Sequence, residues 1–178
     1  TGKFFAGHSL GEYTALVCAN SLDLEAAAFL LHERGKAMQN AVPVNKGLML
    51  AILGMDIQEV KENINSISFK GVCEIANDNC PGQVVVSGDK EAVQELDNIL
   101  KKKSIRSVIL PVSAPFHCSL MQNASINMEE KILSSKFKEP APLVISNVTA
   151  KPENNTERIK NLLVEQITSM VKWRESIN

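Results

Sequence analysis

The pentapeptide Gly7-His8-Ser9-Leu10-Gly11 constrains this chain most, because it joins an apolar stretch to a helical one. The residues before it, Phe4-Phe5-Ala6, are typical of a short strand, and Leu10 to about Ala19 predicts a helix. A Gly-x-Ser-x-Gly sequence between a strand and a helix is typical of a nucleophile elbow, in which small residues permit a strained turn at the serine. We therefore expect an α/β fold with Ser9 exposed at the turn and the Leu10 amide available to an oxyanion.

The middle of the chain has an informative order of elements. Apolar alternation and helical spacing predict strand, helix, strand, strand, helix and strand at 47–54, 57–65, 72–76, 83–87, 90–103 and 107–112. This β-α-β-β-α-β order is that of a ferredoxin-like unit. We expect residues 47–112 to form a small ferredoxin-like subdomain, inserted into the fold that carries the elbow.

The segments on either side of this region supply the remaining elements. Asp23 is a typical N-cap for a second helix, which Pro43 ends. Beyond a loop at 114–117, the pattern predicts a helix, a buried strand, a polar turn and a helix at 119–134, 143–146, 152–156 and 157–168. Together these segments predict a three-layer, hydrolase-like α/β core made of residues 1–46 and 113–178.

Composition excludes several classes of function. Nineteen Lys and Arg residues against twenty Asp and Glu residues give a net charge of −1, without the basic surplus that binding nucleic acid requires. No apolar run is long enough for a membrane span and no signal peptide opens the chain, so we expect a cytoplasmic protein without membrane contact. The four cysteines form neither a disulfide framework nor a CxxC pair, which favours a reducing compartment and predicts no metal site.

A serine hydroxyl needs a base within hydrogen-bond reach, and the chain has three histidines. His8 lies beside Ser9 in the elbow and should point away from it, so packing is its expected role. His32 lies in a predicted helix among charged residues, which is typical of a solvated face. His117 lies on a loop between a strand and a helix, where side chains can converge on a neighbouring strand end, and is the predicted base.

The chain offers no well-placed acid to orient His117. In the α/β-hydrolase order, an Asp or Glu lies between the serine and the histidine. The aspartates in that interval all fall within the predicted subdomain or its turns: Asp56, Asp78, Asp89 and Asp97. The sequence therefore argues against an ordinary α/β-hydrolase and leaves the orienting acceptor open, a main-chain carbonyl being one candidate.

Six motifs follow one another along the chain. They are Gly7-His8-Ser9-Leu10-Gly11-Glu12-Tyr13; His32-Glu33-Arg34-Gly35 leading to Met38-Gln39; Ala76-Asn77-Asp78-Asn79 leading to Gln83 and Ser87-Gly88; Pro111-Val112-Ser113 leading to Phe116-His117; Ser146-Asn147-Val148-Thr149-Ala150; and Glu165-Gln166 leading to Trp173. In this order they resemble the motifs of the malonyl-CoA:acyl carrier protein transacylase family. The resemblance covers essentially the whole chain and is far more specific than the elbow alone.

The resemblance implies a role for each matched residue. Ser9 would take a malonyl group from coenzyme A as an ester, with His117 acting as base and then as acid to the leaving thiolate. The phosphopantetheine thiol of acyl carrier protein would accept the group, for fatty acid biosynthesis. Arg34 would bind the free carboxylate of malonate, and the backbone carbonyl of Gln166 would orient His117. Leu10 would supply one oxyanion donor.

Several of these positions also have plain explanations in the residues themselves. Arg34 could be a surface ion-pair partner of Glu33, and Gln166 a solvated helix residue. Asn77 and Asn147 match family positions near the cleft, although a turn asparagine bonding its own backbone explains either of them. Phe116 resembles the pattern that accompanies malonyl rather than branched substrates, and a core role explains it equally.

The resemblance also implies partners and extent. The coenzyme A thioester is a substrate, no permanently bound cofactor is implied, and acyl carrier protein is the partner. Because acyl carrier proteins are acidic, a cationic docking patch is expected, and the candidates by charge are Lys101, Lys102, Lys103 and Arg106. A solvated helix end explains the same residues. Because six residues precede Gly7 and the chain ends soon after Trp173, we expect the core to be truncated at both ends, without the family's second oxyanion donor.

Two other classes of function stay open at this point. A serine hydrolase of the esterase or lysophospholipase type shares the elbow, but it should show an acidic partner for the histidine and gains nothing from Arg34. A non-catalytic acyltransferase-like domain is the other class, and the expected truncation is its only support.

Overall fold

A four-stranded sheet forms from the middle of the chain. Its elements are β2 (Gly47–Leu53), α3 (Ile57–Asn65), β3 (Cys73–Cys80), β4 (Gln83–Asp89), α4 (Lys90–Lys102) and β5 (Arg106–Ile109). In the computed structural model, which describes residues 2–178, the strands are all antiparallel and lie in the order β3-β4-β2-β5. Leu50 and Ile52 of β2 are buried with residues of α3 and α4, whereas Met49 and Ala51 belong to a separate cluster, as the two-residue repeat of a strand requires.

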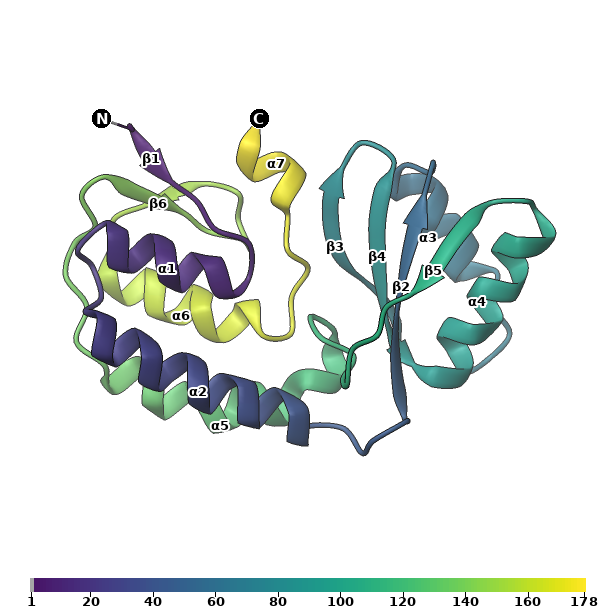
Figure 1. The fold of residues 1–178 in the computed structure, drawn as a ribbon, viewed down its shortest axis with the longest axis horizontal. Helices are drawn as coiled ribbons and strands as arrows, with labels where there is room; N and C mark the ends of the chain where they lie inside the picture. The colour runs from purple at the N-terminus through teal and green to yellow at the C-terminus, as the bar shows by residue number, and fades with distance from the viewer. Residues whose placement is uncertain (1) are drawn as a thin grey trace.

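The elbow lies in the other half of the molecule (Figure 1). This half contains β1 (Phe4–Phe5), α1 (Leu10–Cys18), α2 (Leu24–Asn40), a 3₁₀ turn (Ser119–Met121), α5 (Gln122–Ser134), β6 (Leu143–Ile145), β7 (Pro152–Glu153), α6 (Thr156–Gln166) and α7 (Trp173–Ile177). The strands form a small mixed sheet in the order β1-β6-β7, with β1 parallel to β6 and β7 antiparallel to it. The core of this half consists largely of fully buried helical side chains, among them Leu16, Leu30, Met128 and Leu163.

The two halves are joined by main-chain contacts as well as by the chain itself. We call residues 167–172, which connect α6 to α7, the linking segment. Its Val171 bonds to the outer strand β3: Val171 N–H donates to the Ala76 carbonyl at 2.8 Å, and Asp78 N–H donates to the Val171 carbonyl at 3.0 Å. Arg174 of α7 then forms a two-pronged ion pair with Asp78, with N···O distances of 2.8–3.0 Å. These bonds place α7 beside β3 (Figure 1).

The α/β class predicted from the sequence is confirmed, and most predicted elements are present. Asp23 caps α2 as predicted, its side chain accepting from Ala26 N–H at 2.8 Å. The prediction was wrong in two details. The segment 152–156, expected to be a turn, contains the short strand β7, and β3 continues to Cys80 rather than ending at Ala76. Thr1, the first residue of the predicted core, lies outside the described residues.

Three further differences concern lengths and ends. The last strand of the four-stranded sheet, expected at 107–112, is the shorter β5, and the helix α7 was not predicted. The second helix ends at Asn40, three residues before the proline expected to end it. Within residues 2–178, none of the helices has both the length and the apolar composition needed to cross a membrane.

Candidate active site

The backbone at Ser9 is strained in the way an elbow requires. Ser9 lies between β1 and α1 with φ 52° and ψ −103°, and a positive φ is unfavourable for a residue with a side chain. A Cβ atom at Gly7 would overlap the carbonyl of Gly11, so a glycine is needed there. At Gly11 the corresponding space is open. The close approach of the two segments therefore depends on the first glycine of the motif and not on the second.

Asn147 holds the strained turn from the loop after β6. Its side-chain oxygen accepts from Ser9 N–H at 2.6 Å, and its Nδ2 donates to the Gly7 carbonyl at 2.8 Å. Asn147 is fully buried, so water does not compete for these bonds. The asparagine thus bonds to the elbow and not to its own turn, which was the plain alternative for this residue.

His117 contacts both Ser9 and Gln166. The distance from Ser9 Oγ to His117 Nε2 is 2.8 Å, and the distance from His117 Nδ1 to the Gln166 carbonyl oxygen is 2.9 Å. A carbonyl oxygen can only accept, so Nδ1 carries the proton and Nε2 is left to accept from the serine hydroxyl. The acceptor that the sequence left open is therefore a main-chain carbonyl.

Burial keeps the His117 ring uncharged. The side chain is 5% exposed, and burial lowers the pKa of His117 to about 4, with the nearby Arg34 charge acting in the same direction. The bond to the Gln166 carbonyl raises this pKa, but by less. Near pH 7 the ring is neutral and can accept a proton from Ser9.

Arg34 extends from α2 into the same site. Its Nη2 donates to Ser9 Oγ at 2.9 Å and to Gln166 Oε1 at 3.0 Å, and the guanidinium lies 5.9 Å from the centre of the Tyr13 ring. Burial lowers the pKa of Arg34, which is only 6% exposed. Among the described residues, no carboxylate forms an ion pair with Arg34, and its buried Nε has no acceptor. Arg34 is thus not the surface partner of Glu33 that its sequence context allowed.

Glu12 is a component of this site that sequence reasoning missed. It lies on α1, one turn after Ser9, and is 3% exposed. Its Oε2 accepts from Gln166 Nε2 at 2.8 Å and from Asn147 N–H at 3.0 Å. Burial raises the pKa of Glu12 to about 7, although both hydrogen bonds and the Arg34 charge oppose the shift.

The other sequence candidates lie around this group. Leu10 is the first residue of α1, and the amides at the start of a helix have no acceptor within it. Phe116 packs against the hydrophobic clusters of both halves. Asn77 is buried in β3, where its Nδ2 has no partner among the described residues, and it bridges to Val171. The placement of these three residues does not test the roles that the resemblance implies for them.

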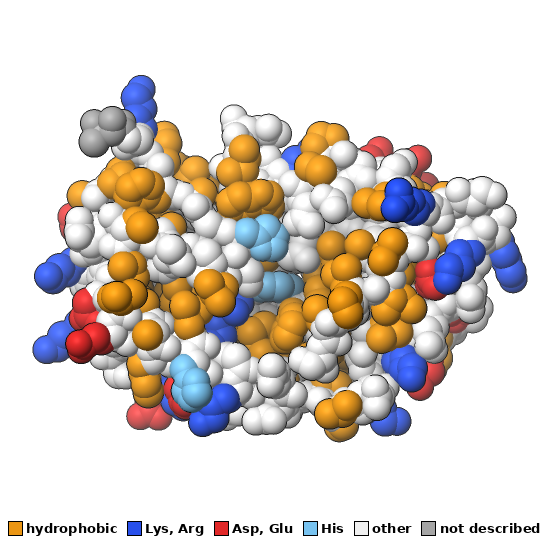
Figure 2. Space-filling model, in the orientation of Figure 1, with side chains coloured by type: hydrophobic (Ala, Val, Ile, Leu, Met, Phe, Trp, Pro, Cys, Tyr) orange, Lys and Arg blue, Asp and Glu red, His pale blue; other side chains and the backbone are white. Residues whose placement is uncertain are grey.

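The remaining histidines lie as the sequence predicts. His8 points to Asn79, with 2.9 Å between His8 Nε2 and Asn79 Oδ1, and its ring lies 5.4 Å from that of Trp173. His32 is exposed on α2. Figure 2 shows histidine side chains (pale blue) at the centre of a face that is hollowed between the two halves, with hydrophobic side chains (orange) around them.

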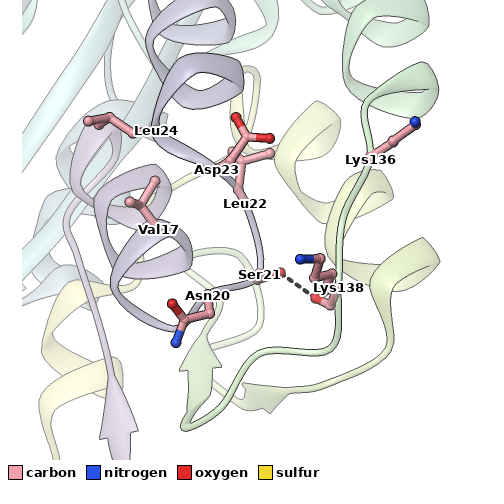
Figure 3. Close-up of a pocket in the computed structure, with 8 residues that line it drawn as sticks. All are labelled: Val17, Asn20, Ser21, Leu22, Asp23, Leu24, Lys136 and Lys138. Atoms are coloured by element: carbon pink, nitrogen blue, oxygen red, sulfur yellow. Dashed lines mark hydrogen bonds between the residues drawn. The ribbon is translucent and has the colours of Figure 1, made fainter.

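A separate pocket lies at the opposite end of α1. It has a volume of about 360 Å³ and is lined by Val17, Asn20, Ser21, Leu22, Asp23, Leu24, Lys136 and Lys138 (Figure 3). Two of its polar side chains serve the fold, since Asp23 caps α2 and Ser21 Oγ donates to the Lys138 carbonyl at 2.6 Å. None of the candidate catalytic residues lines it. Within residues 2–178, no cluster of three or more His, Cys, Asp or Glu side chains could hold a metal ion.

Comparison with known proteins gives a consistent result. The family described as acyl transferase domain matches residues 1–178. The malonyl CoA-acyl carrier protein transacylase of Bacillus subtilis is 41% identical over 180 residues, covering 100% of this chain and 57% of that protein. The crystal structure of the acyl-carrier-protein-S-malonyltransferase from Bartonella henselae is 46% identical, with a TM-score of 0.94 over 98% of this chain and 56% of that one.

A third comparison includes a partner. A malonyl-transacylase solved in complex with its type II PKS acyl-carrier protein is 38% identical, with a TM-score of 0.93 over 97% of this chain and 56% of that one. The chain thus spans a little over half the length of the relatives it matches.

Proposed function

Because this chain belongs to the acyl transferase domain family, we propose that it moves a malonyl group from coenzyme A, through an ester on Ser9, to the phosphopantetheine thiol of acyl carrier protein. The proposal extends to fatty acid biosynthesis, the pathway in which malonyl-carrier thioesters are used. One observation carries it: the hydroxyl of Ser9 lies 2.8 Å from the neutral base His117 and 2.9 Å from the buried cation Arg34. This pairing suits a substrate that has a negative charge close to its reacting carbonyl.

In the first half-reaction, Ser9 Oγ attacks the thioester carbonyl while His117 Nε2 takes the hydroxyl proton. The tetrahedral oxyanion accepts from the Leu10 amide at the start of α1. As this intermediate collapses, the C–S bond breaks and His117 returns the proton to the coenzyme A thiolate. The second half-reaction reverses these steps, with the phosphopantetheine thiol as nucleophile and Ser9 as leaving group. Gln166 acts through its carbonyl, which keeps Nδ1 protonated.

Arg34 selects the substrate by its charge. The malonyl carboxylate displaces the Ser9 contact and pairs with the guanidinium, whose planar fork suits a two-pronged contact. The Nε of Arg34, which has no acceptor among residues 2–178, is one of the donors for this contact. Phe116 limits the space beside the malonyl group and disfavours a branched acyl chain.

The organisation of the chain follows the same proposal. Residues 1–46 and 113–178 form a three-layer, hydrolase-like catalytic core, and residues 47–112 form an inserted ferredoxin-like subdomain. The strand order β3-β4-β2-β5, with every neighbouring pair antiparallel, supports this assignment of the subdomain. Acyl carrier protein, the acidic partner, docks at a cationic surface, for which the exposed side chains of Lys101, Lys102, Lys103 and Arg106 are candidates. The solved malonyl-transacylase complex supports a carrier protein as partner.

The test is acylation of the natural full-length protein by malonyl-CoA, followed by intact-mass spectrometry and peptide mapping. We expect a lasting malonyl adduct on Ser9 that is discharged by addition of acyl carrier protein bearing phosphopantetheine. Ser9→Ala should form no adduct and should fold normally, because a half-buried hydroxyl contributes little to packing. Rapid hydrolysis without transfer would instead indicate an esterase, and no reaction in the folded wild-type protein would indicate a non-catalytic domain.

A further inference from the structure

The side chain of Gln166 lies between the carboxyl group of Glu12 and the guanidinium of Arg34. Its Nε2 donates to Glu12 Oε2 at 2.8 Å and, at the longer distance of 3.2 Å, to the Ser9 carbonyl, and its Oε1 accepts from Arg34 Nη2 at 3.0 Å. Carboxylate and carbonyl oxygens accept hydrogen bonds here, and a guanidinium only donates them. Only one of the two orientations of the Gln166 amide therefore satisfies all three neighbours.

We infer that Glu12 is a positioning residue, which as the nearer of two acceptors, beside the Ser9 carbonyl, sets the orientation of the Gln166 amide and thereby holds Arg34 at Ser9. The inference rests on the proposed function, because it explains how the malonyl-binding group is kept in place. Glu12 itself is fixed by the backbone, since its Oε2 also accepts from Asn147 N–H at 3.0 Å. Glu12 touches no reacting atom and reaches Arg34 through Gln166.

Burial makes the orientation of the Gln166 amide decisive for Arg34. Gln166 is 0% exposed and Arg34 is 6% exposed, so water cannot readily replace a lost partner. If the Gln166 amide turned over, its NH₂ group would face Arg34, placing donor against donor. Arg34 would then keep Ser9 Oγ as its only side-chain acceptor among the described residues and would move toward a better one.

Two replacements of Glu12 separate this role from a general effect of charge or packing. Glu12→Gln keeps an acceptor at the Oε2 position, because Asn147 N–H requires an oxygen there, and so it keeps the Gln166 orientation while removing the charge. Glu12→Met has a similar length and removes the acceptor. The matched control is Asp97→Asn, which changes a carboxylate of similar burial on α4, bonded to Lys101 and Ser107.

The first measurement is kcat/KM for acylation of Ser9 by malonyl-CoA and by acetyl-CoA, in the full-length protein. We expect Glu12→Met to lower the malonyl value about 100-fold, the loss that a misplaced binding group typically causes. Its effect on acetyl transfer should be about tenfold smaller, because acetyl has no carboxylate to pair with Arg34. Glu12→Gln should retain the malonyl preference, and Asp97→Asn should leave the ratio of the two values unchanged.

The second measurement is the titration of His117 by NMR, which does not depend on activity. In Glu12→Met the pKa of His117 should rise, because the Arg34 charge that helps to lower it moves away. Glu12, whose own pKa is raised to about 7, is already uncharged where His117 titrates, so loss of its charge cannot produce this rise. In Glu12→Gln the pKa should not rise.

The outcomes distinguish the inference from the function on which it rests. Equal losses for the two esters in Glu12→Met, or a His117 pKa that does not rise, would overturn the role of Glu12. Wild-type protein that takes an acyl group from neither ester would overturn the proposed function instead, and the His117 titration would then decide alone on Glu12. If Glu12→Met does not fold, Gln166→Met serves in its place, because it removes the amide and keeps the backbone carbonyl. The same preferential loss of malonyl transfer is expected, and an unchanged preference overturns the inference.

Discussion

Arg34 has an environment that folding alone does not explain. A buried guanidinium loses its hydration, and proteins usually compensate with a carboxylate. Within residues 2–178, the direct partners are a serine hydroxyl, a neutral amide and the face of Tyr13, while the buried Nε has none. Such a cation is more costly to the folded state than a paired one, which is typical of a residue kept for binding.

Replacing Arg34 should therefore affect malonyl transfer more than acetyl transfer. Arg34→Ala removes the cation that pairs with the malonyl carboxylate, and we expect it to raise the barrier for malonyl transfer by about 3 kcal/mol, within the range for losing a bonded charged group. Arg34→Lys should recover part of this loss, because a point charge cannot reproduce the planar fork. Serine acylation by the two coenzyme A esters in both variants is the measurement. Equal losses for malonyl and acetyl would show that Arg34 supports the structure rather than selecting the acid.

The residues of the site differed in how far the sequence could identify them. Ser9 and His117 could be inferred from local context, because an elbow and a loop between a strand and a helix leave local patterns. Gln166 was identified only through the resemblance, since its carbonyl role depends on backbone position and not on residue type. Glu12 was missed because its partners Asn147 and Gln166 lie 135 and 154 positions further along the chain.

At the scale of elements, β3 shows why some bounds could not be predicted. Its end contains Asn77 and Asp78, buried polar residues that are typical of a turn. Val171 bonds to the main chain on either side of Asn77, and Arg174 pairs with the Asp78 side chain. The bulge between Ile75 and Asn77 also breaks the two-residue repeat. By contrast, β2 and α4 were predicted closely. β2 is an uninterrupted run of apolar residues, and α4 carries its buried apolar residues at regular helical spacing.

The ion pair between Asp78 and Arg174 should stabilise the junction between β3 and α7. Arg174→Met leaves the carboxylate of Asp78 buried without its partner, and we expect it to lower the free energy of unfolding. The loss should exceed that of an exposed pair, because Asp78 is only 2% exposed, although the Arg174 side chain is 34% exposed. Adding Asp78→Asn to this variant should restore part of the loss, because no unpaired charge then remains.

Urea unfolding of the wild type, the single variant and the double variant measures these differences. The control is Lys36→Met, which removes the exposed pair with Glu33 at 3.4 Å and should change the free energy of unfolding by less than about 0.5 kcal/mol. An effect of Arg174→Met as small as that of the control would contradict a stabilising role for the pair.

In the whole molecule, the candidate site lies where the two halves meet. Ser9, Arg34 and His117 all belong to residues 1–46 and 113–178, but the neighbouring Phe116 packs against clusters of both halves and His8 contacts Asn79 of β3. The sequence predicted the order of elements in each half, because that order is carried by local periodicity. It could not predict how the halves join, because the junction consists of main-chain bonds of the linking segment and of single polar pairs.

Glu12 and His117 also make opposite contributions to the pH dependence of unfolding. The folded pKa of Glu12 is raised from 4.5 to about 7, so a rise in pH through this window ionises the unfolded state first and lowers stability. The folded pKa of His117 is lowered from 6.5 to about 4, so a fall in pH through this window protonates the unfolded state first and lowers stability. Between pH 4.5 and 6.5 the two effects oppose each other in the wild-type protein.

Removing one of the two groups should reveal the slope that this group contributed. Relative to wild type, the stability of Glu12→Gln should rise with pH between 5 and 6, because the falling contribution of Glu12 is lost, and that of His117→Gln should fall, because the rising contribution of His117 is lost. Each slope should approach about 1.4 kcal/mol per pH unit, the value for one proton. Free energies of unfolding from urea titrations at pH 5, 5.5 and 6 provide the measurement, and all other groups cancel in the comparison with wild type. Slopes of the same sign in the two variants would show that at least one of the two pKa shifts is absent in solution.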